Sequence, residues 1–213
     1  MKSPAGRRPR ARELGIRLGI LEPGRYNAIT DVADVRVGHV TIVDEGSADP
    51  ARGPARTGVT VVLPHGGNIF RQKVPAAFHV INVFGKAAGG TQLQELGVLE
   101  TPVALTNTLS VGSAFEGLVR QALAADLEIG RSAGNVNPVV AECSDARLND
   151  IRALAVRPEH VVRLFGAQRG PRGRAGPGGI PEPAGAHLGH SAPTPFSKER
   201  PRSADLANRS TTC

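Results

Sequence analysis

The sequence predicts an α+β fold, and two observations support this prediction. Short runs rich in β-branched and other apolar residues, each of the length of a strand, recur up to residue 167. Between and after them stand segments whose apolar residues repeat at helical spacing, the clearest beginning at Ala114. The 213 residues allow one domain, or one domain with a tail.

Composition divides the chain into a basic leader at 1–13, a globular part at 14–167 and a tail at 168–213. The net charge is +7, but the leader has five basic residues against one acidic residue and the tail seven against three. The excess positive charge therefore lies in the two ends, and a nucleic-acid partner is not indicated. The tail also holds seven glycines and seven prolines, so it cannot bury enough apolar surface to offset its ordering entropy and is predicted to be disordered.

Cysteine usage excludes some classes of protein. Cys143 and Cys213 are the only cysteines and form no CxxC motif, so neither a disulfide framework nor a zinc site is implied. This usage fits a cytoplasmic location. No window approaches the roughly 18 apolar residues of a membrane helix. His187 and His190 lack companion ligands, and we expect no metal or cofactor.

In chain order, residues 26–42 predict a pair of strands with a break at Gly38. A polar loop follows, and residues 58–64 predict the clearest strand. Residues 78–84 (FHVINVF) predict a third strand.

A glycine-rich stretch, GKAAGG at 85–90, follows the third strand. The order required by a P-loop is absent, so a nucleotide site is not indicated, and small residues here allow a close backbone approach. Thr91 and Gln94 then have the spacing of a capping box for a short helix that Gly97 ends.

The chain is organised around residues 101–112, which read TPVALTNTLSVG. A strand at 103–105 is followed by three short polar side chains, Thr106, Asn107 and Thr108, and then by a helix from Ala114 to about Asp126. Two interpretations are open. These polar residues cap the helix, or they meet a carbonyl oxygen or an anion at its N-terminus.

The last predicted elements are a strand at 138–143 and a helix at 159–165 that Pro158 begins. Glu142, Asp145 and Asp150 gather after the strand. They could serve as acid or base, or form salt bridges and turn caps.

Four stretches in this order resemble the large subunit of the DmpA family, the P1 or S58 peptidases described as L-aminopeptidase/D-esterase or β-aminopeptidase. They are YNAITDVADVRVGHVTIVDEG, RTGVTVVLPHGGNIF, FGKAAGGTQLQELGVLETPVALTNTLSVG and AGNVNPVVAECSDARLNDI. The resemblance covers about 25–165.

The resemblance implies a four-layer αββα sandwich of the DmpA and ornithine-acetyltransferase-like type. It also implies an N-terminal-nucleophile hydrolase, whose precursor undergoes autoproteolysis before a serine and whose new α-amine acts as base for that hydroxyl. The implied substrate is a small peptide, or an amino-acid amide or ester. Intact relatives form homo-oligomers.

Five residues are carried over as candidates for the substrate pocket or the oxyanion side. Asn107, Thr108 and Ser110 match one motif, and Asn137 and Asn149 match another. A pocket tyrosine is a theme of the family, but the only tyrosine here is Tyr26.

The family's glycine-rich segment, self-cleavage site and nucleophilic serine have no counterpart in 166–213. We therefore expect a truncated, inactive chain, and hypothesise that a frameshift produced the tail.

Two other readings remain open. An acyl transferase like ornithine acetyltransferase would need a threonine nucleophile in its own motif, and none is evident. A non-catalytic binding module or degenerate fragment could use basic tails on nucleic acid, but Phe196 is the only aromatic residue in the tail.

Overall fold

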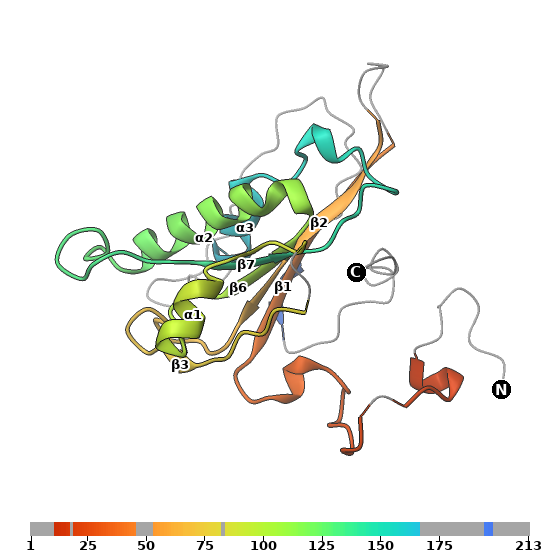
Figure 1. The fold of residues 1–213 in the computed structure, drawn as a ribbon, viewed down its shortest axis with the longest axis horizontal. Helices are drawn as coiled ribbons and strands as arrows, with labels where there is room; N and C mark the ends of the chain where they lie inside the picture. The colour runs from red at the N-terminus through yellow and green to blue at the C-terminus, as the bar shows by residue number, and fades with distance from the viewer. Residues whose placement is uncertain (1–10, 18, 46–52, 82–83, 167–193, 198–213) are drawn as a thin grey trace, which may run out of the picture.

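A computed structural model describes residues 11–17, 19–45, 53–81, 84–166 and 194–197 (Figure 1). Within these residues a six-stranded sheet, a two-stranded sheet and three α-helices are formed. The predicted α+β class is confirmed. None of the described helices combines the length and the apolar character needed to cross a membrane.

The strands are β1 (Arg36–Asp44), β2 (Ala55–Leu63), β3 (Val74–Pro75), β4 (Ala87–Ala88), β5 (Val98–Leu99), β6 (Val103–Thr106), β7 (Val139–Glu142) and β8 (Thr194–Ser197). The α-helices are α1 (Gly90–Leu96), α2 (Val111–Ala125) and α3 (Pro158–Gly166). Four short 3₁₀ helices are η1 (Ala11–Leu14), η2 (Ile29–Asp31), η3 (Thr108–Ser110) and η4 (Ile151–Ala153).

The large sheet has the order β4-β7-β6-β2-β1-β8, and β3 pairs with β5 separately. β1 and β2 are antiparallel over nine residue pairs, from Arg36 opposite Leu63 to Asp44 opposite Ala55. β6 and β7 are parallel, and α2 lies between them in the chain. Parallel neighbours require such a crossover, so the ends of β6 and β7 lie at the same edge of the sheet.

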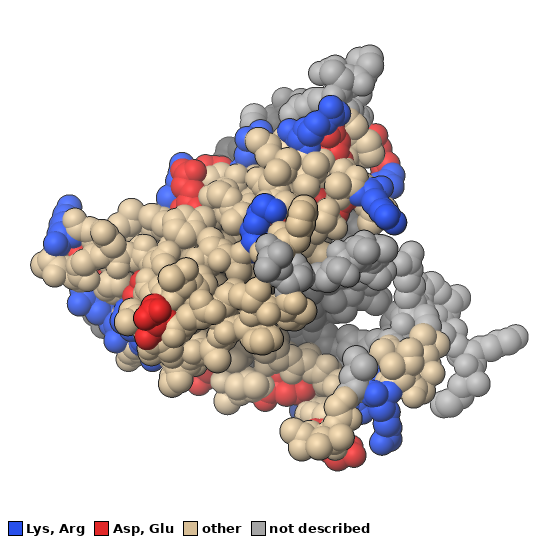
Figure 2. Space-filling model, in the orientation of Figure 1, with Lys and Arg blue, Asp and Glu red and all other residues tan. Residues whose placement is uncertain are grey.

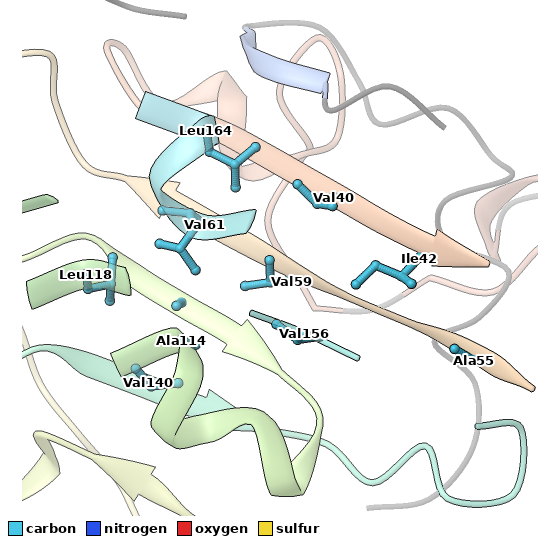
Figure 3. Close-up of a cluster of buried hydrophobic side chains, with 12 residues drawn as sticks. Val40, Ile42, Ala55, Val59, Val61, Ala114, Leu118, Val140, Val156 and Leu164 are labelled. Atoms are coloured by element: carbon cyan, nitrogen blue, oxygen red, sulfur yellow. The ribbon is translucent and has the colours of Figure 1, made fainter. Parts of the chain in front are cut away.

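The core lies between one face of the sheet and helices α2 and α3 (Figures 1 and 3). Alternate residues of each strand point to this face, because side chains of a strand alternate between faces. The buried cluster comprises Val40, Ile42, Ala55, Val59, Val61, Ala104, Ala114, Leu118, Val140, Val156, Val161 and Leu164. Aliphatic side chains fill it, as the scarcity of aromatic residues requires.

Most predicted elements are present with shifted ends. β2, β6, β7 and α3 correspond to the strands at 58–64, 103–105 and 138–143 and the helix at 159–165. α2 begins at Val111, three residues before the predicted start, because η3, which Asn107 caps, leads directly into it. α1 begins at Gly90, so Thr91 lies inside the helix and the predicted capping box is wrong.

The predicted strand pair at 26–42 is also wrong. Gly38 does not break a strand, because it lies within β1 and pairs with Val61 along the continuous ladder. The preceding residues form turns instead of a strand. The Asp31 carboxylate accepts bonds from the backbone N–H groups of Tyr26 (2.8 Å) and Ala28 (3.0 Å), which hold η2 in place.

The predicted strand at 78–84 is not formed in its described residues, 78–81 and 84. The segment has strand propensity, but among the described residues no strand pairs with it. Ile81 and Phe84 are therefore exposed, at 90% and 87% of their surface.

The predicted disorder of the tail differs from the structure at one place. Thr194–Ser197 forms β8 and pairs antiparallel with β1. The outer edge of β1 offers unpaired backbone groups, which favour pairing with an extended segment. The rest of 168–213, with His187 and His190, lies outside the described residues, as do residues 1–10 of the leader.

Helices α2 and α3 approach closely at Gly117. A Cβ atom at this position would lie 2.6 Å from the Cβ of Val161 and 2.8 Å from the carbonyl oxygen of Pro158. A Cβ atom added at Gly112, also in α2, would meet no neighbouring atom within 4 Å. The close contact between α2 and α3 therefore requires glycine at position 117, because a larger residue would collide with α3.

We expect Gly117→Ala to lower the free energy of unfolding, because overpacking costs about 1–3 kcal/mol and exceeds the gain in helix propensity of at most about 1 kcal/mol. Chemical denaturation of the full chain measures this. Gly112→Ala is the matched control and should leave stability unchanged or raised. Equal effects of the two substitutions would contradict the packing account.

Candidate functional site

Polar side chains gather where β6 and β7 end, which we call the β6–β7 end. Thr106 pairs with Glu142 in the last rung of the parallel ladder, and the N–H of Cys143 donates to the carbonyl of Thr106 at 3.0 Å. Thr108 follows in η3, at the entrance to α2. Side chains that stand 34 positions apart in the chain thus become neighbours.

The Glu142 carboxylate is the centre of this end. One oxygen accepts a hydrogen bond from Thr108 Oγ1. The other accepts the backbone N–H of Lys86 at 3.1 Å and lies 4.0 Å from Lys86 Nζ. Only 7% of the Glu142 side chain is exposed. A largely buried carboxylate whose described cation lies only at the limit of ion-pair distance retains the capacity to bind an ammonium group.

Asn107 is buried, and both the oxygen and the nitrogen of its amide form hydrogen bonds. Its Oδ1 accepts the N–H of Ser110 at 3.1 Å, and its Nδ2 donates to Thr57 Oγ1 at 2.7 Å. The first bond is an N-cap of η3, which leads directly into α2. The capping interpretation therefore describes Asn107, while Thr108 points to Glu142.

Asn149 reaches the same edge of the sheet. Its Oδ1 accepts the N–H of Arg56 at 3.2 Å, and its Nδ2 donates to Asp145 Oδ1 at 3.2 Å. Arg56 and Thr57 are consecutive residues of β2, so Asn149 and Asn107 fasten two loops to the start of one strand. Through these hydrogen bonds, both asparagines support the loops of the β6–β7 end.

Ser110 is fully buried at the start of α2. Its backbone N–H bonds to Asn107, and its Oγ has no hydrogen-bond partner within the part of the chain that the structure describes. Asp150 serves as a turn cap, because its carboxylate accepts the N–H groups of Gly53 (3.0 Å) and Arg152 (3.3 Å), whereas the Asp145 carboxylate accepts Asn149 Nδ2. Hydrogen bonds to Arg152 and Gly53 lower the pKa of Asp150.

Asn137 is separated from the other four candidates. It precedes β7, whereas the site residues follow β6 or β7, and parallel strands place these positions at opposite edges. Its N–H donates to Glu100 Oε1 at 2.9 Å. The sequence motif thus contains residues from two ends of the sheet.

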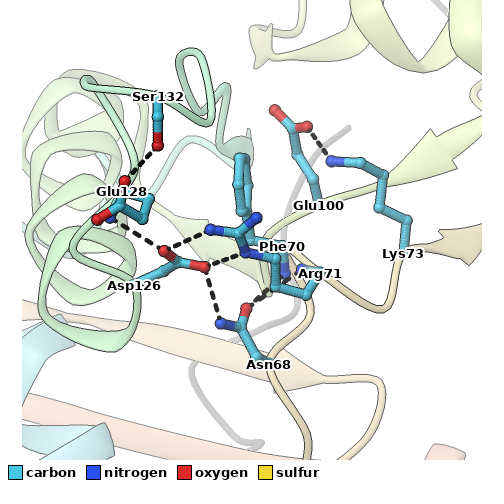
Figure 4. A network of polar contacts seen from close by, with 8 residues as sticks. All are labelled: Asn68, Phe70, Arg71, Lys73, Glu100, Asp126, Glu128 and Ser132. Atoms are coloured by element: carbon cyan, nitrogen blue, oxygen red, sulfur yellow. Dashed lines mark hydrogen bonds and ion pairs between the residues drawn. The ribbon is translucent and has the colours of Figure 1, made fainter.

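The opposite edge holds its own ionic contacts (Figure 4). Glu100 is buried and pairs with Lys73 Nζ at 2.7 Å. Burial acts to raise the pKa of Glu100, but hydrogen bonds from Lys73, Gln92 and Asn137 together lower it below its ordinary value.

Beside this pair, Asp126 at the end of α2 binds the loop that follows β2, in what we call the Arg71–Asp126 network. Its carboxylate accepts Arg71 Nη2 at 2.9 Å, Asn68 Nδ2 at 3.2 Å and the N–H of Glu128 at 3.1 Å. The hydrogen bonds from Arg71 lower the pKa of Asp126 from 3.8 to about 2, although burial opposes the shift. The carboxylates of Glu100 and Asp126 therefore hold the loop at residues 68–73 in place.

A small cavity of about 40 Å³ lies beside the network, lined in part by Asn68, Phe70 and Glu100. It has the room of one or two water molecules and is too small for a peptide. Among the described residues, no group of three His, Cys, Asp or Glu side chains is placed to hold a metal ion. The candidate for a substrate site is the β6–β7 end, because it holds a largely buried carboxylate beside a hydroxyl group.

The charged side chains on the face seen in Figure 2 are dispersed. Lys and Arg are interspersed with Asp and Glu around a largely uncharged surface. This part of the described surface carries no continuous basic patch of the kind that nucleic-acid binding requires.

Sequence reasoning noted Glu142 as a carboxylate but did not pair it with Thr108. The signal was available in part, because a strand, a helix and a second strand follow one another at 103–142. If the two strands are parallel neighbours, the polar residues after each meet at one edge. Lys86 carried no such signal, since β4 joins β7 from a distant part of the chain.

The comparisons with known proteins agree on one family. A family model described as Peptidase family S58 matches residues 27–180. The curated beta-peptidyl aminopeptidase BapA of Sphingosinicella microcystinivorans is 43% identical over 159 residues, which are 74% of this chain and 38% of the relative. The chain thus spans about two fifths of the length of this relative.

Solved structures agree. The PH0078 protein from Pyrococcus horikoshii OT3 matches with a TM-score of 0.67 and 52% identity, over 72% of this chain and 44% of that one. The L-aminopeptidase D-Ala-esterase/amidase from Ochrobactrum anthropi matches with a TM-score of 0.62 and 36% identity, over 73% and 43%. That protein is described as a prototype of the serine aminopeptidases and a new variant of the Ntn hydrolase fold.

We expect Asn107→Ala to lower the free energy of unfolding by about 1–3 kcal/mol, because it removes the cap and leaves buried partners unsatisfied. Urea titration of the full chain measures the change. Asn137→Ala is the control: it retains the backbone N–H that binds Glu100 and should change stability by less than about 0.5 kcal/mol. A neutral Asn107→Ala would show that its side-chain bonds contribute nothing.

We expect the contribution of Asp126 to depend on acidity. Since its pKa is lowered to about 2 in the folded chain, the ionised form stabilises the fold above about pH 4, and this stability is lost as the pH falls toward 2. Asp126→Asn should therefore destabilise the chain at pH 7 and have a much smaller effect near pH 2. Thermal unfolding across this range measures the difference.

The control is Glu116→Gln, which removes a carboxylate from an exposed pair with Arg120 and should change little at either pH. An effect of Asp126→Asn that does not vary with pH would argue against the Arg71 contact as its source.

Proposed function

Because the chain belongs to peptidase family S58, we propose that it is the large-subunit part of a serine aminopeptidase that removes N-terminal residues from peptides or from amino-acid amides and esters. The observation that carries this proposal is the Thr108–Glu142 pair at the β6–β7 end. An aminopeptidase must recognise a free ammonium group, and a buried carboxylate at a strand end provides that recognition.

In the proposed site, Glu142 binds the substrate ammonium and Thr108 orients the carboxylate. Asn107 and Asn149 hold the loops that carry these groups, and Ser110 with the first turn of α2 lies beside them. The unpaired N–H groups of a helix N-terminus favour a carbonyl oxygen that gains negative charge. An oxyanion developing next to Ser110 would therefore be stabilised there.

We further propose that the nucleophile is a serine released by autoproteolysis, acting with its own α-amine as base. The matched part of the chain corresponds to about two fifths of the length of the Sphingosinicella microcystinivorans relative, and we assign the nucleophile to the remainder of such a protein. The 213-residue chain should then be inactive by itself. We propose a cytoplasmic location, from cysteine usage, and a homo-oligomeric assembly like that of intact relatives.

Within the residues that the structure describes, the second face of the sheet carries exposed apolar side chains, which support a four-layer αββα sandwich. Ile42 and Ala104 face the helices, and their neighbours Val43 and Leu105 point to the other side, where they are 37% and 40% exposed. Exposed apolar residues on a sheet face favour packing against a second sheet. In the complete enzyme, that second sheet would come from the remainder of the polypeptide.

A chimera tests the function. Residues 1–166 of this chain are joined to the corresponding remainder of the Sphingosinicella microcystinivorans aminopeptidase. We expect the 213-residue chain to hydrolyse no β-amino-acid amide, whereas the chimera cleaves itself into two polypeptides and releases the amino acid. Gel electrophoresis and an ammonia-release assay report the two events. A chimera that folds and cleaves itself but hydrolyses none of these amides would overturn the proposal.

In the active chimera, Glu142→Gln should lower kcat/KM by roughly 10- to 100-fold, because it removes a charged hydrogen bond to the substrate ammonium. Steady-state kinetics measure the loss, which should be smaller for a substrate without the amine. Glu95→Gln, on the exposed side of α1, is the control and should behave as the unmodified chimera. Equal kinetics for both variants would exclude Glu142 as the ammonium anchor.

A further inference from the structure

Lys86 lies next to the carboxylate that we assign to substrate recognition. Its backbone N–H donates to Glu142 Oε1 at 3.1 Å, and its Nζ lies 4.0 Å from the same oxygen. About half of its side chain is exposed. The backbone contact is a good hydrogen bond, whereas the side-chain contact is at the limit of an ion pair.

The other contacts of Nζ are equally loose and come from its own loop. The carbonyl oxygen of Phe84 is 3.5 Å away, and the centroid of the Phe84 ring is 5.4 Å away. The second described lysine at a buried glutamate differs, since Lys73 Nζ approaches Glu100 to 2.7 Å. The cation of Lys86 is thus near Glu142 without being fixed to it.

Glu142 has little room for two cations. Thr108 Oγ1 donates to one oxygen and the backbone N–H of Lys86 donates to the other, and Lys86 Nζ lies 4.0 Å from that second oxygen. An ammonium group that approaches the second oxygen from the side of Lys86 therefore meets Lys86 Nζ. Two ammonium groups at one carboxylate repel each other, and this repulsion is largest when the site is shielded from water.

On the basis of the proposed function, we propose that Lys86 is an internal competitor for the ammonium site. Its Nζ neutralises Glu142 in the free protein and moves toward solvent when the substrate amine binds. The long half-exposed side chain permits this movement. The backbone N–H keeps its bond to the carboxylate throughout, so Glu142 stays in place. Lys86 therefore acts as a positioning residue that limits affinity for amines.

The test is binding of β-alaninamide to the full 213-residue chain, followed by NMR through the backbone amide of Cys143. We expect Lys86→Met to lower the Kd about two- to fivefold, the range of a weak exposed ion pair. Lys86→Arg retains a cation and should bind as the unmodified chain does. The neutral analogue 3-hydroxypropanamide carries no ammonium and should not distinguish the three proteins.

Arg131→Met is the matched control. It removes one exposed positive charge from the loop after α2, toward the edge of the sheet opposite the β6–β7 end, and should leave the Kd unchanged. Thermal unfolding of each variant verifies that it is folded. An unchanged or higher Kd for Lys86→Met overturns the inference, as does an equal gain for the neutral analogue. Absence of measurable binding by Lys86→Met overturns it as well, because that variant leaves Glu142 free of its competitor.

Glu142→Gln separates this inference from the proposed function. If Glu142→Gln weakens binding of β-alaninamide and Lys86→Met does not strengthen it, Glu142 remains the ammonium anchor and only the competition fails. If Glu142→Gln binds as tightly as the unmodified chain, the anchor itself is excluded and both proposals fail.

Discussion

The parallel pairing of β6 with β7 is the constraint on which the rest of the structure depends. The crossover through α2 places Ala104 beside Val140 under that helix, and in the same register it places Thr106 beside Glu142 at the strand ends. One register thus determines both the packing of the core (Figure 3) and the meeting of polar groups at the edge. Because side chains alternate along a strand, a slip by one residue would turn Glu142 away from Thr108.

The two edges of the sheet use charged groups in different ways. At the edge of Figure 4, Asp126 and Glu100 have close cationic partners and lowered pKa values, so they stabilise the loops that they join. At the β6–β7 end, Glu142 has a hydroxyl and a backbone donor but only a distant cation. A carboxylate with a cation at short ion-pair distance holds the joined segments together. A carboxylate whose nearest cation is more distant retains the capacity to bind a ligand.

Asn107 and Asn149 support the loops of the β6–β7 end through hydrogen bonds of their side-chain amides. The amides of the two side chains form hydrogen bonds with Thr57, Arg56, Ser110 and Asp145. These bonds fix the loops around Glu142. Their place in a family motif thus has a structural explanation. The exposed apolar residues on the other side of the sheet are suited to packing against a further layer.

The sequence by itself determined the α+β class, the positions of β2, β6, β7 and α3, and the family. These follow from local signals: β-branched runs, helical spacing, proline at a helix start, and long motifs in order. The tertiary structure alone decided that residues 26–35 form turns, that the described residues of 78–84 lack a strand partner, and that Asn137 lies away from the other candidate residues. It also brought Lys86 and Thr108 to Glu142. The physical reason is that strand pairing joins residues far apart in the chain, and periodicity within a segment carries no information about its partner.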